Sequence, residues 1–284
     1  MAKLIQYCTH ASLYDGAFDS VVGWAAAGMG YIITSNDGII AVDGGLPEDA
    51  GSFIELLEKN SEGTPRIKKW IITHPHLDHY GALKAISKNE SLRSRICIEE
   101  LIFYFPAEFM NNEGTHVCAG AEALMQEISA LTGAKISTPR YNEKQTVGEL
   151  ELCFIYTPDD CTIFKGQQNA NVCSLIFTVQ GKEKKAMFTG DAFRRSLQLT
   201  TWRLGKDLKC DILQMPHHGL CDTGVLDFYK AVDAETVLIP ISKAGDRSMH
   251  SGEHKDCDTA ANLWAEKNAK KVYKAFEGTI ALEI

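Results

Sequence analysis

The sequence predicts an α/β fold in which two β-sheets pack against each other and helices cover the outside. Runs rich in β-branched and aromatic residues alternate with helical patterns, and these runs gather in two halves that are each followed by helices. The chain has 284 residues, 45% of them apolar, which is enough to bury a sizeable core. No linker rich in Pro, Gly or Ser divides it, so we expect one domain over residues 1–284.

The first half opens with a strand pair. The runs 30–34 and 38–42 flank Asn36-Asp37-Gly38, a strong signal for a β-hairpin. The other elements expected here are a helix over 47–59 with a proline at its start, a strand over 70–72, a helix over 79–87, a β-rich run over 96–105 and a helix over 118–131 that Gly133 ends.

The second half repeats this alternation. Strands are expected over 150–156, 173–179, 185–188, 211–215 and 236–241, and helices over 224–231 and 259–267. Two further strands, over 271–276 and 279–283, close the chain around Gly278.

Composition narrows the class of protein. The formal net charge is −8, which argues against long nucleic acid and anionic membranes as partners. No apolar stretch reaches the ~18 residues of a membrane helix, and the N-terminus lacks the apolar segment of a secretory signal.

The nine cysteines are odd in number and form no CxxC, so we expect reduced thiols in a cytoplasmic protein; Cys221, near two histidines, is the most interesting of them. The oligomeric state stays open.

The chemistry is concentrated in His74-Pro75-His76-Leu77-Asp78-His79, directly after a buried strand and before a helix. A sharp loop at a strand end lets His74 and His76 face one metal ion, while Asp78 and His79 face a second ion nearby. Imidazole and carboxylate ligands suit zinc, and also iron or manganese.

This motif resembles the signature of the metallo-β-lactamase superfamily, whose members are metal-dependent hydrolases. The resemblance implies a four-layer αββα sandwich. Ile40-Ala41-Val42-Asp43-Gly44-Gly45 is similar to an early strand of that family, which implies that Asp43 supports the metal loop without binding metal. Phe188-Thr189-Gly190-Asp191 is similar to the strand that ends in the carboxylate bridging both ions, so Asp191 is the expected bridge.

The segment 211–219, with its double histidine, resembles the branch that contains the hydrolase domain of competence proteins and phosphocholine esterases. This resemblance implies that His217 or His218 completes the second metal site, and the sequence leaves open which one. The late His250 is placed like a histidine of that branch, so we expect it to donate a proton to the leaving oxygen. We assign Asp78 and His250 to catalysis, Asp78 also being a ligand.

One departure from the superfamily lies just before the strand that leads to Asp191. Most members have a third histidine of the first metal site there, whereas this chain has Asn169-Ala170-Asn171-Val172-Cys173-Ser174. The competence-type branch also has asparagine at this place. We therefore expect two divalent metal ions, with the first site the weaker because Asn171 replaces an imidazole.

Together these residues predict a binuclear metal-dependent hydrolase of a small molecule. A hydroxide between two ions is a nucleophile at neutral pH, because each metal lowers the pKa of bound water toward ~7. Ions ~4 Å apart suit attack on phosphate esters, so a phosphodiester or phosphocholine-like phosphoester is the expected substrate. A carbonyl substrate (lactone, thioester or lactam) is the alternative, and a non-catalytic metal-binding domain of the same fold is the second alternative.

Overall fold

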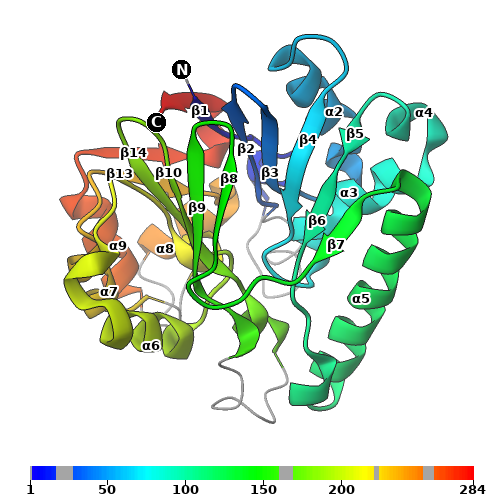
Figure 1. The fold of residues 1–284 in the computed structure, drawn as a ribbon. Helices are drawn as coiled ribbons and strands as arrows, with labels where there is room; N and C mark the ends of the chain where they lie inside the picture. Colours follow the sequence, from blue (N-terminus) through cyan, green and yellow to red (C-terminus); the bar gives the residue numbers. More distant parts are fainter. Residues whose placement is uncertain (1, 17–27, 160–168, 221–223, 252–258) are drawn as a thin grey trace.

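The computed structural model describes residues 2–16, 28–159, 169–220, 224–251 and 259–284. Two β-sheets face each other, and helices cover the outer face of each, so the layers run helix, sheet, sheet, helix (Figure 1). This arrangement confirms the predicted α/β sandwich. Cys221 lies outside the described residues.

The first sheet has eight strands within the described residues, in the spatial order β15-β1-β2-β3-β4-β6-β7, with β5 beside β4. β2 and β3 form the predicted antiparallel hairpin, whereas β3, β4 and β6 run parallel. The strands are β1 Lys3–Gln6, β2 Gly30–Ser35, β3 Gly38–Asp43, β4 Arg66–Ile71, β5 Cys97–Ile98, β6 Glu100–Ile102, β7 Lys135–Ser137 and β15 Ile280–Glu283.

The second sheet has seven strands in the described parts of the chain, in the order β14-β13-β12-β11-β10-β9-β8. β11, β12, β13 and β14 run parallel to one another, and the remaining pairs are antiparallel. The strands are β8 Lys144–Val147, β9 Leu150–Tyr156, β10 Ile176–Gln180, β11 Lys185–Phe188, β12 Ile212–Gln214, β13 Thr236–Ile239 and β14 Lys271–Lys274.

Helices α2 to α5 pack on the first sheet, and α6, α7 and α9 pack on the second (Figure 1). No helix in the described residues is long and apolar enough to cross a membrane. The helices are α2 Ala50–Lys59, α3 Leu77–Lys88, α4 Glu90–Arg93, α5 Glu113–Thr132, α6 Arg194–Leu204, α7 Leu226–Val232, α8 Lys243–Ser251 and α9 Ala260–Asn268.

Three local expectations differ from the structure. The strand expected from residue 173 begins only at Ile176, because Ala170–Cys173 form a 3₁₀ turn, η5. The last two strands, β14 and β15, belong to different sheets, since β15 crosses over to pair with β1. The strands β1, β7 and β8 and the helices α6 and α8 were not among the predicted elements, because they are short or strongly polar.

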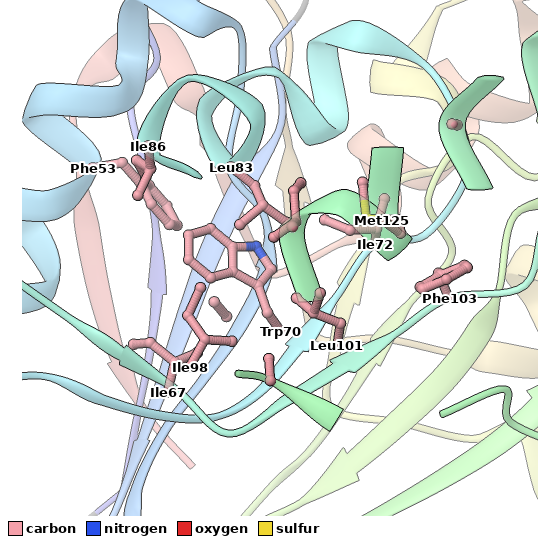
Figure 2. Packing of buried hydrophobic residues seen from close by; sticks show 14 of the residues in the cluster. Phe53, Ile67, Trp70, Ile72, Leu83, Ile86, Ile98, Leu101, Phe103 and Met125 are labelled. Atoms are coloured by element: carbon pink, nitrogen blue, oxygen red, sulfur yellow. The ribbon is translucent and has the colours of Figure 1, made fainter. Parts of the chain in front are cut away.

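Trp70 links the outer core of the first sheet to the functional edge. Its indole is fully buried, and Figure 2 shows it surrounded by aliphatic and aromatic side chains, among them Leu83 and Leu101. Its Nε1 donates a 2.7 Å hydrogen bond to the carbonyl oxygen of Asp43, where β3 ends. Replacing a buried tryptophan with alanine typically costs about 3–5 kcal/mol of stability. Here the change would also release the end of β3.

The parallel strands place their carboxyl ends at one edge of the sandwich. β3 is parallel to β4 in the first sheet, and β11 is parallel to β12 in the second. Between the sheets the aromatic core includes Tyr31 against Phe188, with ring centroids 5.3 Å apart, and Phe177 stacked on Phe188 at 5.1 Å. This packing fixes the two sheets relative to each other, so the residues that follow these strands meet at one place.

Candidate metal centre

The histidine motif occupies the loop between β4 and α3. His76 has extended backbone dihedral angles and stands immediately before the first residue of α3, Leu77. The loop therefore turns sharply enough that the imidazoles and the carboxylate of the motif point to one side. His74 and His79 are fully buried, and their rings lie 4.0 Å apart between centroids.

The described residues contain two groups at this edge whose donor atoms lie close enough to hold an ion. One is His74, His76 and Asp191; the other is Asp78, His79, Asp191 and His218. Within each group the ligand atoms all lie within 4.8 Å of one another. Asp191 belongs to both groups, as a bridging carboxylate must.

Asp191 stands just past the end of β11, after Gly190. Its Oδ2 lies 3.6 Å from His74 Nε2 and 3.4 Å from both His79 Nε2 and His218 Nε2. The backbone holds it there: Gly190 has φ +51°, and the Asp191 N–H donates a 3.1 Å hydrogen bond to Ser174 Oγ. A side chain on Gly190 would meet Thr73 at 2.8 Å, so the turn requires glycine.

The two histidines after β12 have different surroundings. His218 Nδ1 contacts the Pro240 carbonyl oxygen at 2.9 Å, so Nδ1 carries the proton, and its Nε2 lies 3.3 Å from Asp78 Oδ2. His217 Nε2 is 3.8 Å from Asp191 Oδ2, and its ring packs edge-on against Phe193. The geometry groups His218, and not His217, with the second set of ligands.

Both of these histidines have left-handed backbone conformations, with φ +49° for His217 and φ +56° for His218. Two such residues in a row are uncommon outside glycine and cost free energy. Strain of this kind is typical of functional sites.

Asp43 lies behind the metal loop, outside both ligand groups. Its Oδ1 accepts a 2.8 Å hydrogen bond from the Thr73 N–H, and its Oδ2 lies 2.8 Å from His79 Nδ1. A carboxylate in this position holds the proton on Nδ1 and turns the Nε2 lone pair of His79 toward the ligands.

Two residues of this framework were missed by the sequence reasoning. Thr73 donates its hydroxyl to Asp43 Oδ2 at 2.9 Å. Gln214 Oε1 accepts from the N–H groups of Thr189 and Gly190 at 2.7 and 2.8 Å, which fixes the turn before Asp191. A signal for Gln214 was present, because it is a lone polar residue in an otherwise apolar strand that precedes the double histidine.

The two ligand groups differ in electrostatics. Burial, with repulsion from His79, holds the pKa of His74 well below its usual value, and burial lowers the pKa of His76 as well. For His218 burial also acts to lower the pKa, but Asp191 and Asp78 outweigh it and raise the pKa to about 9. The pKa of His79 is raised well above its usual value by the same competition.

The donor set fits divalent metal ions. In the described part of the chain, His79 Nε2, His218 Nε2 and Asp191 Oδ1 are buried polar atoms without a hydrogen-bond partner. Such atoms are costly unless something satisfies them. Imidazole nitrogen and carboxylate oxygen are ligands of zinc, iron and manganese, so metal ions at the two groups would satisfy all three atoms.

Asn171 lines the same region with its side-chain amide. It is buried in η5, and among the described residues neither its Nδ2 nor its Oδ1 has a hydrogen-bond partner. Together with His76 and Asp78 it lines a pocket of about 650 Å³ that reaches Tyr80 and Glu113. The pocket opens directly on the ligand groups, and the amide of Asn171 is free to meet a bound molecule.

His250 is not brought to this centre. It lies in α8 and not in a loop, its ring is 43% exposed, and its Nδ1 lies 2.8 Å from the Asp246 carbonyl oxygen. Its Nε2 lies 3.4 Å from Glu266 on α9. The expected proton donor is therefore misplaced, because the residues after β13 fold into a helix that carries His250 toward α9.

Comparison with known proteins gives one family match, over part of the chain. Residues 26–136 match the family model described as "Metallo-beta-lactamase superfamily". The matched segment includes Asp43 and the whole histidine motif. The match confirms the resemblance to the metallo-β-lactamase superfamily over these residues. No curated protein sequence matches it.

Three solved structures share the fold of this chain over nearly its full length. The fold protein YhfI from Bacillus subtilis is 15% identical, with 99% of this chain and 100% of that chain covered and a TM-score of 0.57. Zn²⁺-bound PqqB from Methylobacterium extorquens is 12% identical, with both chains covered in full and a TM-score of 0.59. Tm1679, described as a metal-dependent hydrolase, is 14% identical, with 99% of each chain covered and a TM-score of 0.54. At these identities the likeness shows the shared fold, and this chain has in that fold a candidate site of His and Asp residues.

Proposed function

We propose that this chain is a binuclear metal-dependent hydrolase that acts on a phosphoester, of the phosphodiester or phosphocholine-like kind. The observation that carries the proposal is the sharing of Asp191 by two ligand groups at one strand edge. His74, His76 and Asp191 would hold one ion, and Asp78, His79, Asp191 and His218 the other. When bound, two adjacent divalent ions, zinc most of all, lower the pKa of water and polarise a phosphoryl oxygen.

The residues of the chain prepare these ligands for metal. Asp43 keeps the proton of His79 on Nδ1, and the Pro240 carbonyl does the same for His218. Both Nε2 lone pairs are thereby aimed at the space beside Asp191. Each ring is already held by a contact on its other nitrogen, so metal binding costs little further side-chain entropy.

The charges of the pocket lining favour a substrate that is not a polyanion. Among its described lining residues, three carry carboxylates, namely Asp78, Glu113 and Asp191, and none is Lys or Arg. Two metal ions balance Asp78 and Asp191, which leaves Glu113 at the mouth of the pocket. A phosphoester whose other end is neutral or cationic fits this charge pattern, and Tyr80 adds an aromatic surface beside it.

Asn171 would contact the substrate. Its buried amide offers two N–H donors and one oxygen acceptor on the pocket wall, without partners among the described residues. A phosphoryl oxygen is an acceptor for such a donor, and a buried donor that gains a partner on binding favours the bound state.

A small panel of substrates tests this proposal. Protein purified without chelator is analysed for metal and then assayed, with added zinc or manganese, on bis-p-nitrophenyl phosphate, p-nitrophenyl phosphorylcholine, a lactone and a thioester. We expect about two ions per chain and hydrolysis of the phosphoesters, the phosphorylcholine ester above all. The Asp191→Asn variant is the matched control for contaminating activity.

The other results would each point to a different function. Faster hydrolysis of the lactone or the thioester would replace the phosphoester with a carbonyl substrate. Full metal loading without hydrolysis of any of the four would indicate a non-catalytic metal-binding domain.

A further inference from the structure

The turn that carries the double histidine is strained over three residues in a row. His217, His218 and Gly219 all have left-handed backbone angles, with φ of +49°, +56° and +75°. Backbone strain of this kind persists only where the surrounding structure holds it. The His217 N–H donates to the Gly190 carbonyl oxygen at 3.0 Å, and the Leu220 N–H donates to the His217 carbonyl oxygen at 2.9 Å. The carbonyl oxygens at the end of the turn are held by a side chain.

Asn262, in the first turn of α9, supplies that side chain. Its Nδ2 donates to the carbonyl oxygen of Gly219 at 3.0 Å and to that of Leu220 at 2.7 Å, so both of its N–H groups are used. Gly224, which follows the turn, also lies against this amide, since a Cβ there would overlap with Asn262 Oδ1. The side chain of Asn262 is buried, and a buried amide with both donors on one turn holds that turn firmly.

Tyr229, on α7, fixes which way the amide faces. Its hydroxyl donates to Asn262 Oδ1 at 2.6 Å. Burial raises the pKa of this hydroxyl well above its usual value, so it keeps its proton and stays a donor. Because the amide oxygen accepts from Tyr229, the amide nitrogen points to the two carbonyl groups. α7 and α9 pack side by side on the second sheet, so the amide is presented by a packed pair of helices (Figure 1).

We propose that Asn262, oriented by Tyr229, is a positioning residue for the ligand group that contains His218. Asn262 holds the end of the strained turn, and the turn holds His218 Nε2 at 3.3 Å from Asp78 Oδ2 and 3.4 Å from Asp191 Oδ2. Without the two donors, buried carbonyl oxygens would lose their partner, and the turn would relax toward ordinary backbone angles. The imidazole of His218 would then leave its place beside the carboxylates. This role rests on the metal centre of the proposed function and is independent of the substrate.

The effect is confined to one of the two ligand groups. His74 and His76 lie in the loop between β4 and α3, on the first sheet. In the described part of the chain, the hydrogen bonds of Asn262 and Tyr229 go to each other and to the turn after His218. A change at Asn262 should therefore weaken one ion and leave the other as it is.

Titration of metal-stripped protein with Co²⁺ measures this directly, because the visible absorption of the ion reports its ligands. Asn262→Leu keeps the volume but removes both donors. We expect it to weaken binding at the group of His218 roughly 10–100-fold, the usual effect of losing an outer contact of a ligand, with unchanged binding at the group of His74 and His76. Tyr229→Phe loses one hydrogen bond, so it should weaken the same ion about fivefold.

His218→Ala serves as the reference for a missing ligand. It identifies which of the two measured affinities belongs to the group of His218. Excess Co²⁺ should restore the parent spectrum in Asn262→Leu, where His218 remains, but not in His218→Ala. Such rescue distinguishes a misplaced ligand from an absent one.

Gln6→Leu is the matched control. Gln6 is also a buried amide that accepts from a tyrosine hydroxyl, that of Tyr31 at 3.2 Å, and donates to a backbone carbonyl, that of Tyr273 at 3.2 Å, but it lies on β1. Its loss should lower the thermal stability, followed by circular dichroism, without changing the affinity for either ion.

Three results would overturn the proposal. The first is an equal loss of Co²⁺ affinity in Gln6→Leu and Asn262→Leu. The second is parent-like affinity in folded Asn262→Leu or, should that variant not fold, in Tyr229→Phe. The third is a parent that binds no ion through His218. A parent that binds both ions but hydrolyses no phosphoester would instead refute the proposed function, and the Co²⁺ titrations would still decide the role of Asn262.

Discussion

The two halves of the metal centre use the same kinds of residue in different electrostatic settings. The first half, His74 and His76 with Asp191, has one carboxylate and two histidines whose pKa values lie below the usual range. The second half places His79 and His218 between the carboxylates of Asp78 and Asp191, and both histidines have raised pKa values.

This difference shows that the second half of the site favours positive charge even without a metal ion. Without metal, protons on His79 and His218 balance the charges of the two carboxylates of the second half. These protons supply the positive charge that a bound metal ion would supply. The first half holds neutral imidazoles and has the amide of Asn171 nearby instead of a third histidine. We therefore expect the second half to bind its ion more tightly, and the first half to exchange its ion more readily.

Removing the shared carboxylate should have the largest effect. Asp191→Asn keeps the size of the side chain but withdraws a charge that both ions would contact, so both metals should be lost while the fold survives. A metal catalyst contributes several kcal/mol, so the rate should fall at least roughly 10³-fold. Metal analysis and phosphoester assays, with circular dichroism for the fold, measure this. A variant with full hydrolysis would show that Asp191 is merely part of a turn.

Separate replacement of the two neighbouring histidines should distinguish the halves. His218→Ala removes a ligand of the second half, and we expect one ion per chain and a rate lowered roughly 10²-fold or more. His217→Ala should keep both ions, since His217 lies outside both ligand groups. Metal content and rate of the two purified variants are compared side by side. If His217→Ala loses the metal and His218→Ala keeps it, the roles are reversed.

The pH dependence of metal binding should differ between the halves. The pKa of His218 is raised to about 9, so below that pH its proton must leave before metal binds. Affinity of the second half should rise with pH up to about 9, by about tenfold per unit for each proton displaced. His74 and His76, with lowered pKa values, are neutral at pH 7, so affinity of the first half should be flat above it.

Isothermal titration of metal-stripped protein from pH 6.5 to 9 measures both affinities. Two unequal sites whose affinities converge at low pH are the expected pattern. Two equal sites at every pH would contradict the comparison between the halves, and a single site at excess metal would contradict the binuclear proposal.

Replacing His250 should have the smallest effect. The ring lies on α8 against Glu266, and ion pairs of such exposed groups contribute about 0–1 kcal/mol to stability. His250→Ala should therefore keep its metal and hydrolyse poor and good leaving groups within about twofold of the parent. A large loss confined to poor leaving groups would restore His250 as a proton donor, and the rate ratio of an alkyl and a p-nitrophenyl ester measures it.

The sequence predicted the parts of the fold that have strong local signals. The hairpin around Asn36-Asp37-Gly38, the helix that Gly133 ends and the strand over 150–156 all formed as expected. β1 and β8 were not predicted, and the pairing of β15 with β1 depends on contacts across almost the whole chain. Local patterns carry no information on such pairing.

The site was predicted as residue types in order, but its geometry was not. The division of His74 and His76 from Asp78 and His79 could be argued from spacing, whereas the choice of His218 depends on left-handed backbone angles that no pattern encodes. His250 was misjudged because an unrecognised helix, α8, carries it away. The sequence shows Asn171 only in place of a missing histidine, whereas the lack of a partner for its buried amide among the described residues depends on the three-dimensional structure.

Because β1 pairs with β15, a strand from much later in the sequence, the first sheet closes late during synthesis. Ribosomes synthesise a protein from its N-terminal side, so β1 and β2 emerge long before Ile280–Glu283 have been made. Until then one side of β1 presents unsatisfied peptide groups, which is the kind of edge on which chains associate. Residues from the far end of the described chain cover this edge, with Lys3 opposite Glu283 and the Ile284 N–H donating to the Ala2 carbonyl oxygen at 3.2 Å. The first sheet can therefore close only after these late residues have been made.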